Sequence, residues 1–116
     1  MFRRKKRSIP TLSMAIAQQK LENNPEILLL DVRTPAEYRQ GHLPGAKNVP
    51  LEQLRQRIPR FLPREDPIFL YCRAGHRSAQ ACEILMEAGY RNGINIGAVT
   101  DYSGPLQTSD PPEGGL

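Results

Sequence analysis

Apolar residues in this chain form short unbroken runs, separated by segments in which they recur every three or four positions. The strongest runs, at residues 27–30 and 67–71, end at Asp31 and Cys72, as expected of strands buried on both faces. Weaker candidates lie at residues 46–49 and 93–96, and a first short strand is expected at Ile9. The pattern predicts an α/β fold with a small, open, mostly parallel sheet of about five strands.

Helical periodicity occurs between the candidate strands, at residues 12–22, 35–39, 51–58 and 78–88. The last of these is the clearest, because Ala81, Leu85 and Ala88 form an apolar stripe and Gly89 follows as a helix stop. Since parallel strands are joined by crossover connections, we expect these helices to cover both faces of the sheet.

The chain length of 116 residues is suited to one hydrophobic core. Residues 9–104 carry the strand and helix pattern, while residues 1–8 form a basic N-terminal tail. Residues 105–116, rich in proline and glycine, are predicted to be a flexible tail. The net charge of +4 depends on the five basic residues at positions 3–7; the rest of the chain has eleven basic and twelve acidic residues. This distribution argues against an extended nucleic-acid-binding face.

Sequence features also bear on compartment and cofactors. No sustained apolar segment follows the basic tail, and no stretch approaches the roughly 20 apolar residues of a membrane span. We therefore expect a cytoplasmic protein. Cys72 and Cys82 form no disulfide framework, and with only His42 and His76 there is no metal-ligand spacing. We expect neither a metal nor an organic cofactor.

The strongest chemical signal is Cys72, which follows a buried strand and begins a short loop that leads into a helix. Parallel-sheet proteins bind ligands at this position. Gly75 lets backbone N–H groups converge, and the helix start near Ser78 adds donors and partial positive charge. Positive charge also comes from three basic side chains of the loop: Arg73, Arg77 and, when protonated, His76. These groups predict a lowered Cys72 pKa and a site for a small dianion.

The chain resembles the rhodanese-homology domain family of sulfurtransferases over about residues 9–104. The matching segments are Leu-Asp-Val-Arg-Thr-Pro-Ala-Glu-Tyr at 30–38, Gly-His-Leu-Pro-Gly-Ala-Lys-Asn-Val-Pro at 41–50, and Tyr-Cys-Arg-Ala-Gly-His-Arg-Ser at 71–78. Near the C-terminal end, Gly97-Ala98 and Tyr102 stand where the family has a Gly-Gly pair and a tryptophan. We interpret this as structural drift, because Tyr102 can still pack an aromatic ring at the core edge.

The resemblance implies that Cys72 takes a sulfane sulfur from a small anionic donor such as thiosulfate and holds it as a persulfide. Cyanide or a thiol, including a protein thiol, then accepts it. The loop residues that would bind the donor are Arg73, Ala74, Gly75, His76, Arg77 and Ser78. Asp31 and Arg33 either orient this loop or form an ion pair that holds neighbouring turns together. Cys82 is expected in the core, and His42 as a hydrogen-bonded structural residue.

Two other functions fit parts of the pattern. Cysteine phosphatases and arsenate reductases also attack an anion from a loop closed by arginine. Those loops usually place one more residue between cysteine and arginine than the four, Arg73 to His76, found here. The other alternative is a non-catalytic interaction module that keeps the fold, although such modules often lose the nucleophile. Sulfur transfer or phosphate release would distinguish the two enzymes, and the module would show neither.

Overall fold

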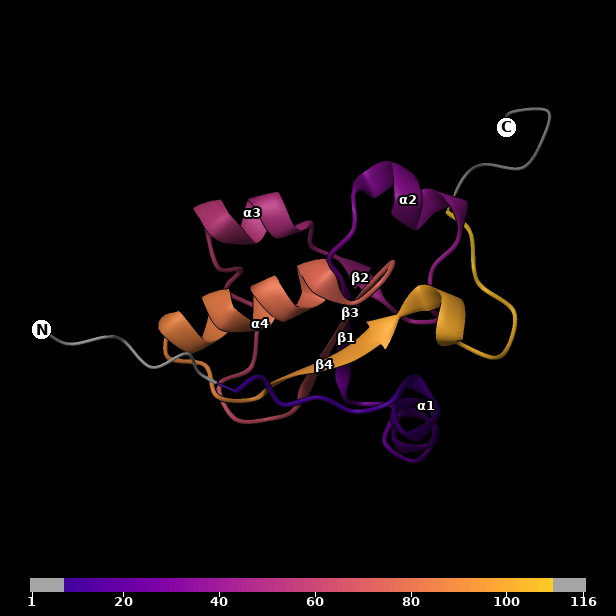
Figure 1. The fold of residues 1–116 in the computed structure, drawn as a ribbon, viewed down its shortest axis with the longest axis horizontal. Coiled ribbons are helices and arrows are strands. Elements are labelled where there is room, and N and C mark those ends of the chain that lie inside the picture. The colour runs from indigo at the N-terminus through magenta and orange to yellow at the C-terminus, as the bar shows by residue number, and fades with distance from the viewer. Residues whose placement is uncertain (1–7, 110–116) are drawn as a thin grey trace, which may run out of the picture.

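A computed structural model describes residues 8–109 of the chain, in which helices and strands alternate (Figure 1). In chain order they are α1 (Met14–Asn23), β1 (Leu28–Asp31), α2 (Pro35–Gln40), β2 (Lys47–Asn48), α3 (Leu51–Gln56), β3 (Ile68–Cys72), α4 (His76–Glu87), β4 (Gly93–Ala98) and the 3-10 helix η1 (Val99–Asp101). The strands form one parallel sheet in the order β2-β1-β3-β4. The predicted parallel α/β fold is confirmed.

Within residues 8–109 the sheet has four strands, so the expectation of about five was wrong by one. The strand expected near Ile9 is reduced to an isolated bridge between Thr11 and Asn95. In this bridge Leu12 donates to the Asn95 carbonyl and the Asn95 N–H donates to the Pro10 carbonyl. Pro10 has no N–H with which to continue the ladder, and this accounts for the short pairing.

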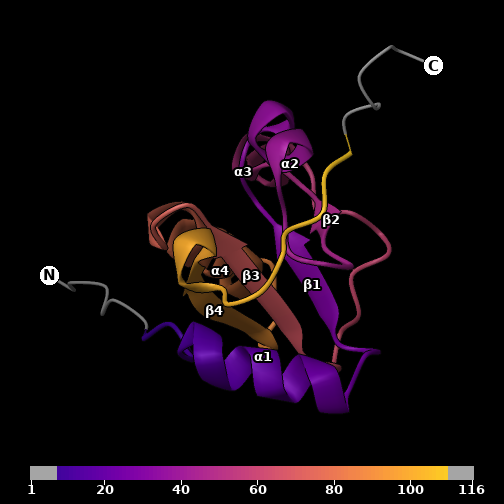
Figure 2. The same cartoon turned by 90° about the vertical axis from the view of Figure 1, so that its right-hand side faces the viewer.

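Both faces of the sheet are covered by helices, as the apolar runs predicted. Figure 2 shows α1 along one side, where its Met14 and Ala17 pack with residues of the sheet including Phe69. The other face is covered by α3 and α4, which contribute Leu54, Ala81, Cys82 and Leu85 to a second cluster. All five residues of β3 are buried, because this strand has a neighbour on each edge and helices on each face.

The helix α2 begins at a capping box, which the sequence encodes locally. The Thr34 hydroxyl accepts from the Glu37 N–H, the Glu37 carboxylate accepts from the Thr34 N–H, and Pro35 occupies the first turn. This arrangement fixes the position of the Glu37 side chain at the start of α2.

Backbone pairing with the rest of the domain continues past residue 104, where the sequence placed the end of the domain. His42 and Gln107 exchange two backbone hydrogen bonds of 2.9 Å, and the Ser109 N–H donates to the Arg39 carbonyl at 3.1 Å. Figures 1 and 2 show this segment passing alongside α2. Its attachment is made by backbone groups, which composition does not reveal. The basic cluster at 3–7 and residues 110–116 lie outside the described residues.

Candidate active site

Cys72 is the last residue of β3 and lies at the carboxyl edge of the sheet, next to the start of α4. Its side chain is almost fully buried, with 1% of the residue exposed. The Gly75 N–H donates to Cys72 Sγ at 2.9 Å, and the Ser78 hydroxyl lies 3.4 Å from the same sulfur. The sulfur is therefore surrounded by hydrogen-bond donors, as the loop sequence predicted.

These donors determine the ionisation of Cys72. Burial by itself favours the neutral thiol, but hydrogen bonds from the Ser78 side chain and from the backbone N–H groups of Ser78, Gly75 and Ala74 outweigh it. The net result is a Cys72 pKa below its ordinary value. The direction agrees with the prediction from the loop sequence, and its main source is hydrogen bonding at the helix start.

Gly75 has a conformation that the loop requires. Its φ of 96° lies in the left-handed region, and this turns the backbone so that the Gly75 N–H points at Cys72 Sγ. A Cβ atom at this position would lie 3.6 Å from the Gly97 Cα of β4. α4 consequently begins at His76, two residues before the predicted start, because Gly75 is its N-cap.

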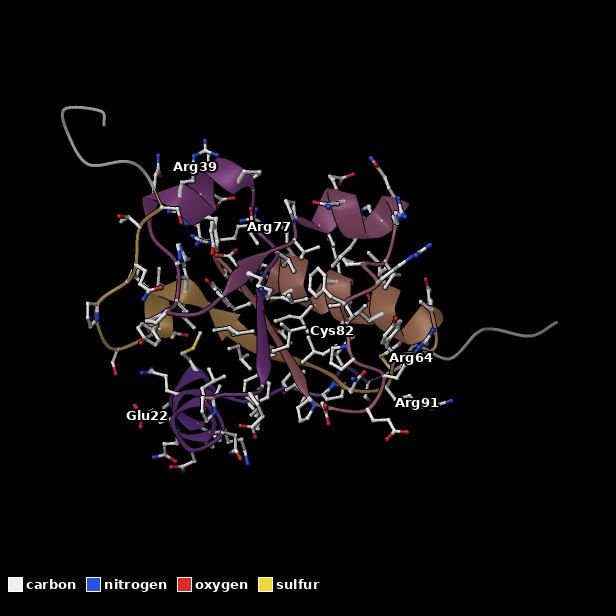
Figure 3. The ribbon with its side chains drawn as sticks, turned by 180° about the vertical axis from the view of Figure 1, so that it is seen from behind. Glu22, Arg39, Arg64, Arg77, Cys82 and Arg91 are labelled. Carbon is white, nitrogen blue, oxygen red and sulfur yellow. The ribbon has the colours of Figure 1, made fainter. Side chains whose placement is uncertain are left out.

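Arg77 points toward α2 and pairs with Glu37 (Figure 3). The two side chains form a bidentate ion pair, with nitrogen–oxygen distances of 2.8 and 3.0 Å. Chiefly through this pair, the pKa of Glu37 falls to about 2. Arg77 therefore ties the first turn of α4 to α2, and its positive charge is partly neutralised there.

The other loop cation, Arg73, and His76 are both exposed, as is Ala74 between them. These residues lie at the outer rim of the loop, whereas Ser78 is fully buried beneath it. A small anion that approaches Cys72 from solvent would meet this rim first.

Asp31 and Arg33 form a buried ion pair. The Arg33 guanidinium donates to both Asp31 carboxylate oxygens at 2.6–3.0 Å and also to the Gly41 carbonyl at 2.6 Å. Tyr71 lies next to the pair; burial and then the Asp31 charge raise the pKa of its hydroxyl, whose oxygen accepts from the Leu43 N–H. Of the two roles considered for this pair, the contacts favour fastening the turn at Gly41 to the sheet.

The remaining residues singled out from the sequence have structural surroundings. Cys82 lies in the core against the sheet (Figure 3), and burial raises the pKa of its thiol to about 12. His42 is buried, stacks on Tyr38 with ring centroids 3.7 Å apart, and its Nδ1 lies 2.8 Å from the Tyr38 carbonyl. Both fit the structural roles expected from their sequence context.

Residues 8–109 contain no cluster of three or more histidine, cysteine or acidic side chains that could hold a metal ion. In the same part of the chain, no helix is long and apolar enough to cross a membrane. The groups gathered around Cys72 are hydrogen-bond donors and basic side chains, and they suit a thiolate that reacts with an anion.

Comparison with known proteins identifies the family to which this arrangement belongs. The family model described as Rhodanese-like domain matches residues 13–101. The chain belongs to the rhodanese-like domain family. This rhodanese-like domain is 43% identical over 77 residues to thiosulfate sulfurtransferase PspE of Escherichia coli, covering 66% of this chain and 74% of that protein. It is 40% identical over 78 residues to a sulfurtransferase of Allochromatium vinosum, covering 67% and 72%.

A solved structure agrees with this assignment. The rhodanese with anions from Escherichia coli superposes with a TM-score of 0.64 at 38% identity, covering 71% of this chain and 98% of that one. Together with the curated relatives, this makes the rhodanese-like domain described here a sulfurtransferase, and the resemblance found in the sequence is confirmed.

Two site residues of the rhodanese-like domain were missed by the sequence analysis, Glu37 and Asn95. Glu37 was visible as the third residue of a capping box, but its pairing with Arg77 joins residues 40 positions apart. Asn95 lies on β4 and binds Gly75 and Ser78. The only local signal for Asn95 is a polar residue within an apolar strand.

Limiting iodoacetamide is expected to alkylate Cys72 and spare Cys82, because their pKa values are displaced in opposite directions. Each pKa unit between the thiols changes the thiolate ratio about tenfold. The reaction is run on the folded domain about one to two pH units below 8.5, the ordinary cysteine pKa, and read by peptide mapping. Preferential modification of Cys82, or modification of Cys72 only above its ordinary pKa, would contradict the site assignment.

Proposed function

We propose that this domain transfers a sulfane sulfur from thiosulfate or a related donor to a thiophilic acceptor through a persulfide on Cys72. The observation that carries the proposal is the 2.9 Å hydrogen bond from the Gly75 N–H to Cys72 Sγ at the end of the central strand. A sulfur held in this way is kept as an anion, the form in which it acts as a nucleophile. The thiosulfate sulfurtransferase identity of a 43% identical relative supports the choice of donor.

The reaction balances with no external oxidant. The Cys72 thiolate attacks the outer sulfur of thiosulfate, a sulfur–sulfur bond forms to Sγ, and the bond to the sulfonate group breaks with its electron pair leaving on sulfite. Cyanide or a thiolate then attacks the outer sulfur of the persulfide. Thiocyanate or an acceptor persulfide leaves, and the Cys72 thiolate is regenerated.

The N–H groups that stabilise the thiolate also suit the persulfide, which is likewise an anion. Ala74, Gly75 and Ser78 supply backbone donors around the sulfur. Because these donors are fixed by the loop and the start of α4, they need little rearrangement as charge moves onto the outer sulfur.

Donor charge is recognised chiefly at the exposed rim of the loop. Arg73 and His76 are exposed there, whereas Arg77 is held by Glu37. A dianionic donor therefore meets Arg73 as the more available guanidinium. Cys72 and Cys82 are both free thiols, which is compatible with a reducing compartment such as the cytoplasm. An acceptor thiol would be available in such a compartment.

Intact-mass measurement after exposure to thiosulfate tests the proposed function. The expected result is a gain of one sulfur atom on Cys72, which is reversed by cyanide with release of thiocyanate. Incubation with para-nitrophenyl phosphate tests the phosphatase alternative and is expected to release no phosphate. If neither reaction occurs, the domain is an interaction module; phosphate release without sulfur transfer would support the phosphatase.

Arg73→Ala is expected to weaken the use of thiosulfate more than the use of benzenethiosulfonate, a monoanion that carries the same kind of transferable sulfur. The lost interaction is with charge, and a charge-assisted contact of about 1.5 kcal/mol corresponds to roughly a tenfold rise in KM for the dianion. Steady-state kinetics with both donors measure the difference. Arg60→Ala, an exposed arginine outside the loop, is the control. Equal losses for the two donors would show that Arg73 does not read donor charge.

A further inference from the structure

Asn95 on β4 makes hydrogen bonds to two of the residues that contact the Cys72 sulfur, Gly75 and Ser78. Its Oδ1 accepts from the Ser78 hydroxyl at 2.7 Å, and its Nδ2 donates to the Gly75 carbonyl at 3.2 Å. The Gly75 nitrogen lies 2.9 Å from Cys72 Sγ, and the Ser78 hydroxyl oxygen lies 3.4 Å from it. The Asn95 carboxamide on the neighbouring strand therefore contacts both Gly75 and Ser78. We call these two residues, whose N–H and hydroxyl face the sulfur, the hydrogen-bonded cradle.

The orientation of the Asn95 carboxamide is fixed by a third partner. The Gly97 N–H can only donate, and it lies 3.0 Å from Asn95 Oδ1. The atom facing Gly97 must therefore be the oxygen, and the NH2 group must face the Gly75 carbonyl. In this orientation the oxygen can accept from the Ser78 hydroxyl and the NH2 group can donate to the Gly75 carbonyl.

The Ser78 hydroxyl has one proton and three acceptors within reach. These are Asn95 Oδ1 at 2.7 Å, the Gly75 carbonyl at 3.2 Å and Cys72 Sγ at 3.4 Å. The Gly75 carbonyl already accepts from the Ala79 N–H and from Asn95 Nδ2, so both of its lone pairs are occupied. With that carbonyl saturated, rotation of the hydroxyl hydrogen from Asn95 to Sγ lets Ser78 stabilise the thiolate without moving its oxygen.

We propose that Asn95 is a positioning residue, which holds the Gly75 N–H and the Ser78 hydroxyl in hydrogen-bonding position around the Cys72 sulfur. The proposal rests on the proposed function in that Cys72 is taken as the reacting thiol. Without Asn95, the Ser78 oxygen loses its shortest hydrogen-bond contact, and the Gly75 carbonyl gains an empty lone pair for the Ser78 proton, so the hydroxyl is no longer held beside Sγ. The Gly75 carbonyl also loses its contact with β4, and with it part of the support for the residue whose N–H donates to Sγ.

Charged groups on the elements around the loop are left in place by an Asn95 substitution. They are Arg73, His76 and Arg77 on the loop and α4, Glu37 on α2, and Asp31 and Arg33 at and after the end of β1. A change in Cys72 ionisation in an Asn95 variant therefore reports the hydrogen-bonded cradle and not a change in charge.

The test measures the pH dependence of Cys72 alkylation by iodoacetamide in Asn95→Ala and in Asn95→Leu, which fills nearly the same volume. We expect the midpoint of the pH profile to rise by about one unit in both variants, which is roughly a tenfold slower reaction below the midpoint. Asn92→Ala is the matched control, because Asn92 directly precedes β4 and its amide donates to the Pro63 and Asp66 carbonyls, away from Cys72. It is expected to lower the melting temperature and leave the midpoint unchanged.

Ser78→Ala completes the test as a double-mutant cycle with Asn95→Ala. If Asn95 acts through Ser78, Asn95→Ala shifts the midpoint less in the Ser78→Ala variant than in the unchanged protein. An unchanged midpoint in both Asn95 variants, an equal shift in Asn92→Ala, or a lowered midpoint would each overturn the proposal. Alkylation needs no sulfur donor, so a domain that shows the expected profile but gains no sulfur from thiosulfate would contradict the proposed function alone.

Discussion

Cys72→Ser is expected to reduce sulfur transfer to the rate of the reaction without protein, while the fold is retained. A serine hydroxyl is a poor nucleophile at neutral pH and cannot form a persulfide. Its oxygen can still accept from the Gly75 N–H, so the loop keeps a hydrogen-bonded partner at this position. Thiocyanate formation from thiosulfate and cyanide measures transfer, and circular dichroism with thermal melting measures the fold.

Cys82→Ala is the control for this experiment, because it removes the other thiol and leaves no new polar group in the core. It is expected to keep transfer per folded molecule near the original level, with some loss of stability from the small cavity. Substantial turnover by Cys72→Ser would refute the persulfide mechanism at this residue, whatever the behaviour of Cys82→Ala.

Arg33→Ala is expected to cause the largest loss of stability, about 3–5 kcal/mol. It removes the guanidinium that pairs with Asp31, whose side chain is fully buried, and it also removes the hydrogen bond to the Gly41 carbonyl. A buried carboxylate without its cation has a high desolvation cost. For a domain of this size, each 1 kcal/mol lowers the melting temperature by roughly 4–8 °C, so thermal and urea melting will detect the change.

Arg55→Ala is the matched control, since Arg55 pairs with Glu52 at 3.4 Å on the surface. An exposed pair of this kind contributes less than about 1 kcal/mol. Joint replacement of Asp31 by Leu and Arg33 by Met is expected to destabilise less than Arg33→Ala alone, because no charge is then left buried. Similar small losses for Arg33→Ala and Arg55→Ala would show that the Asp31–Arg33 pair does not hold the turn at Gly41.

The parts of the fold that sequence predicted well are those with a strong local pattern. The runs at 27–30 and 67–71 correspond closely to β1 and β3, because strands buried on both faces must be apolar throughout. The edge strand β2 is only two residues long, and the pairing at Thr11 is limited by Pro10. Edge pairings of this length depend on backbone geometry, so composition predicts them poorly.

The candidate site divides in the same way. The Cys72 loop was predictable because its glycine, its helix start and its cysteine are consecutive in sequence. The partners that fix it are remote, since Arg77 meets Glu37 across 40 positions and Ser78 meets Asn95 across 17. These contacts depend on which elements pack together, and local periodicity and motif spacing do not show that.

The order of strands has a consequence for how reactivity develops as the chain folds. β4 is the last strand in the sequence, yet it pairs with β3 and carries Asn95 to the Cys72 loop. During synthesis Cys72 is therefore made before the residue proposed to complete its surroundings, and the two meet only when β4 docks. Until then Cys72 lacks this support and is expected to behave more like an ordinary thiol, so the nascent chain is less open to premature oxidation. Chemical reactivity and completion of folding would thus arise in the same step.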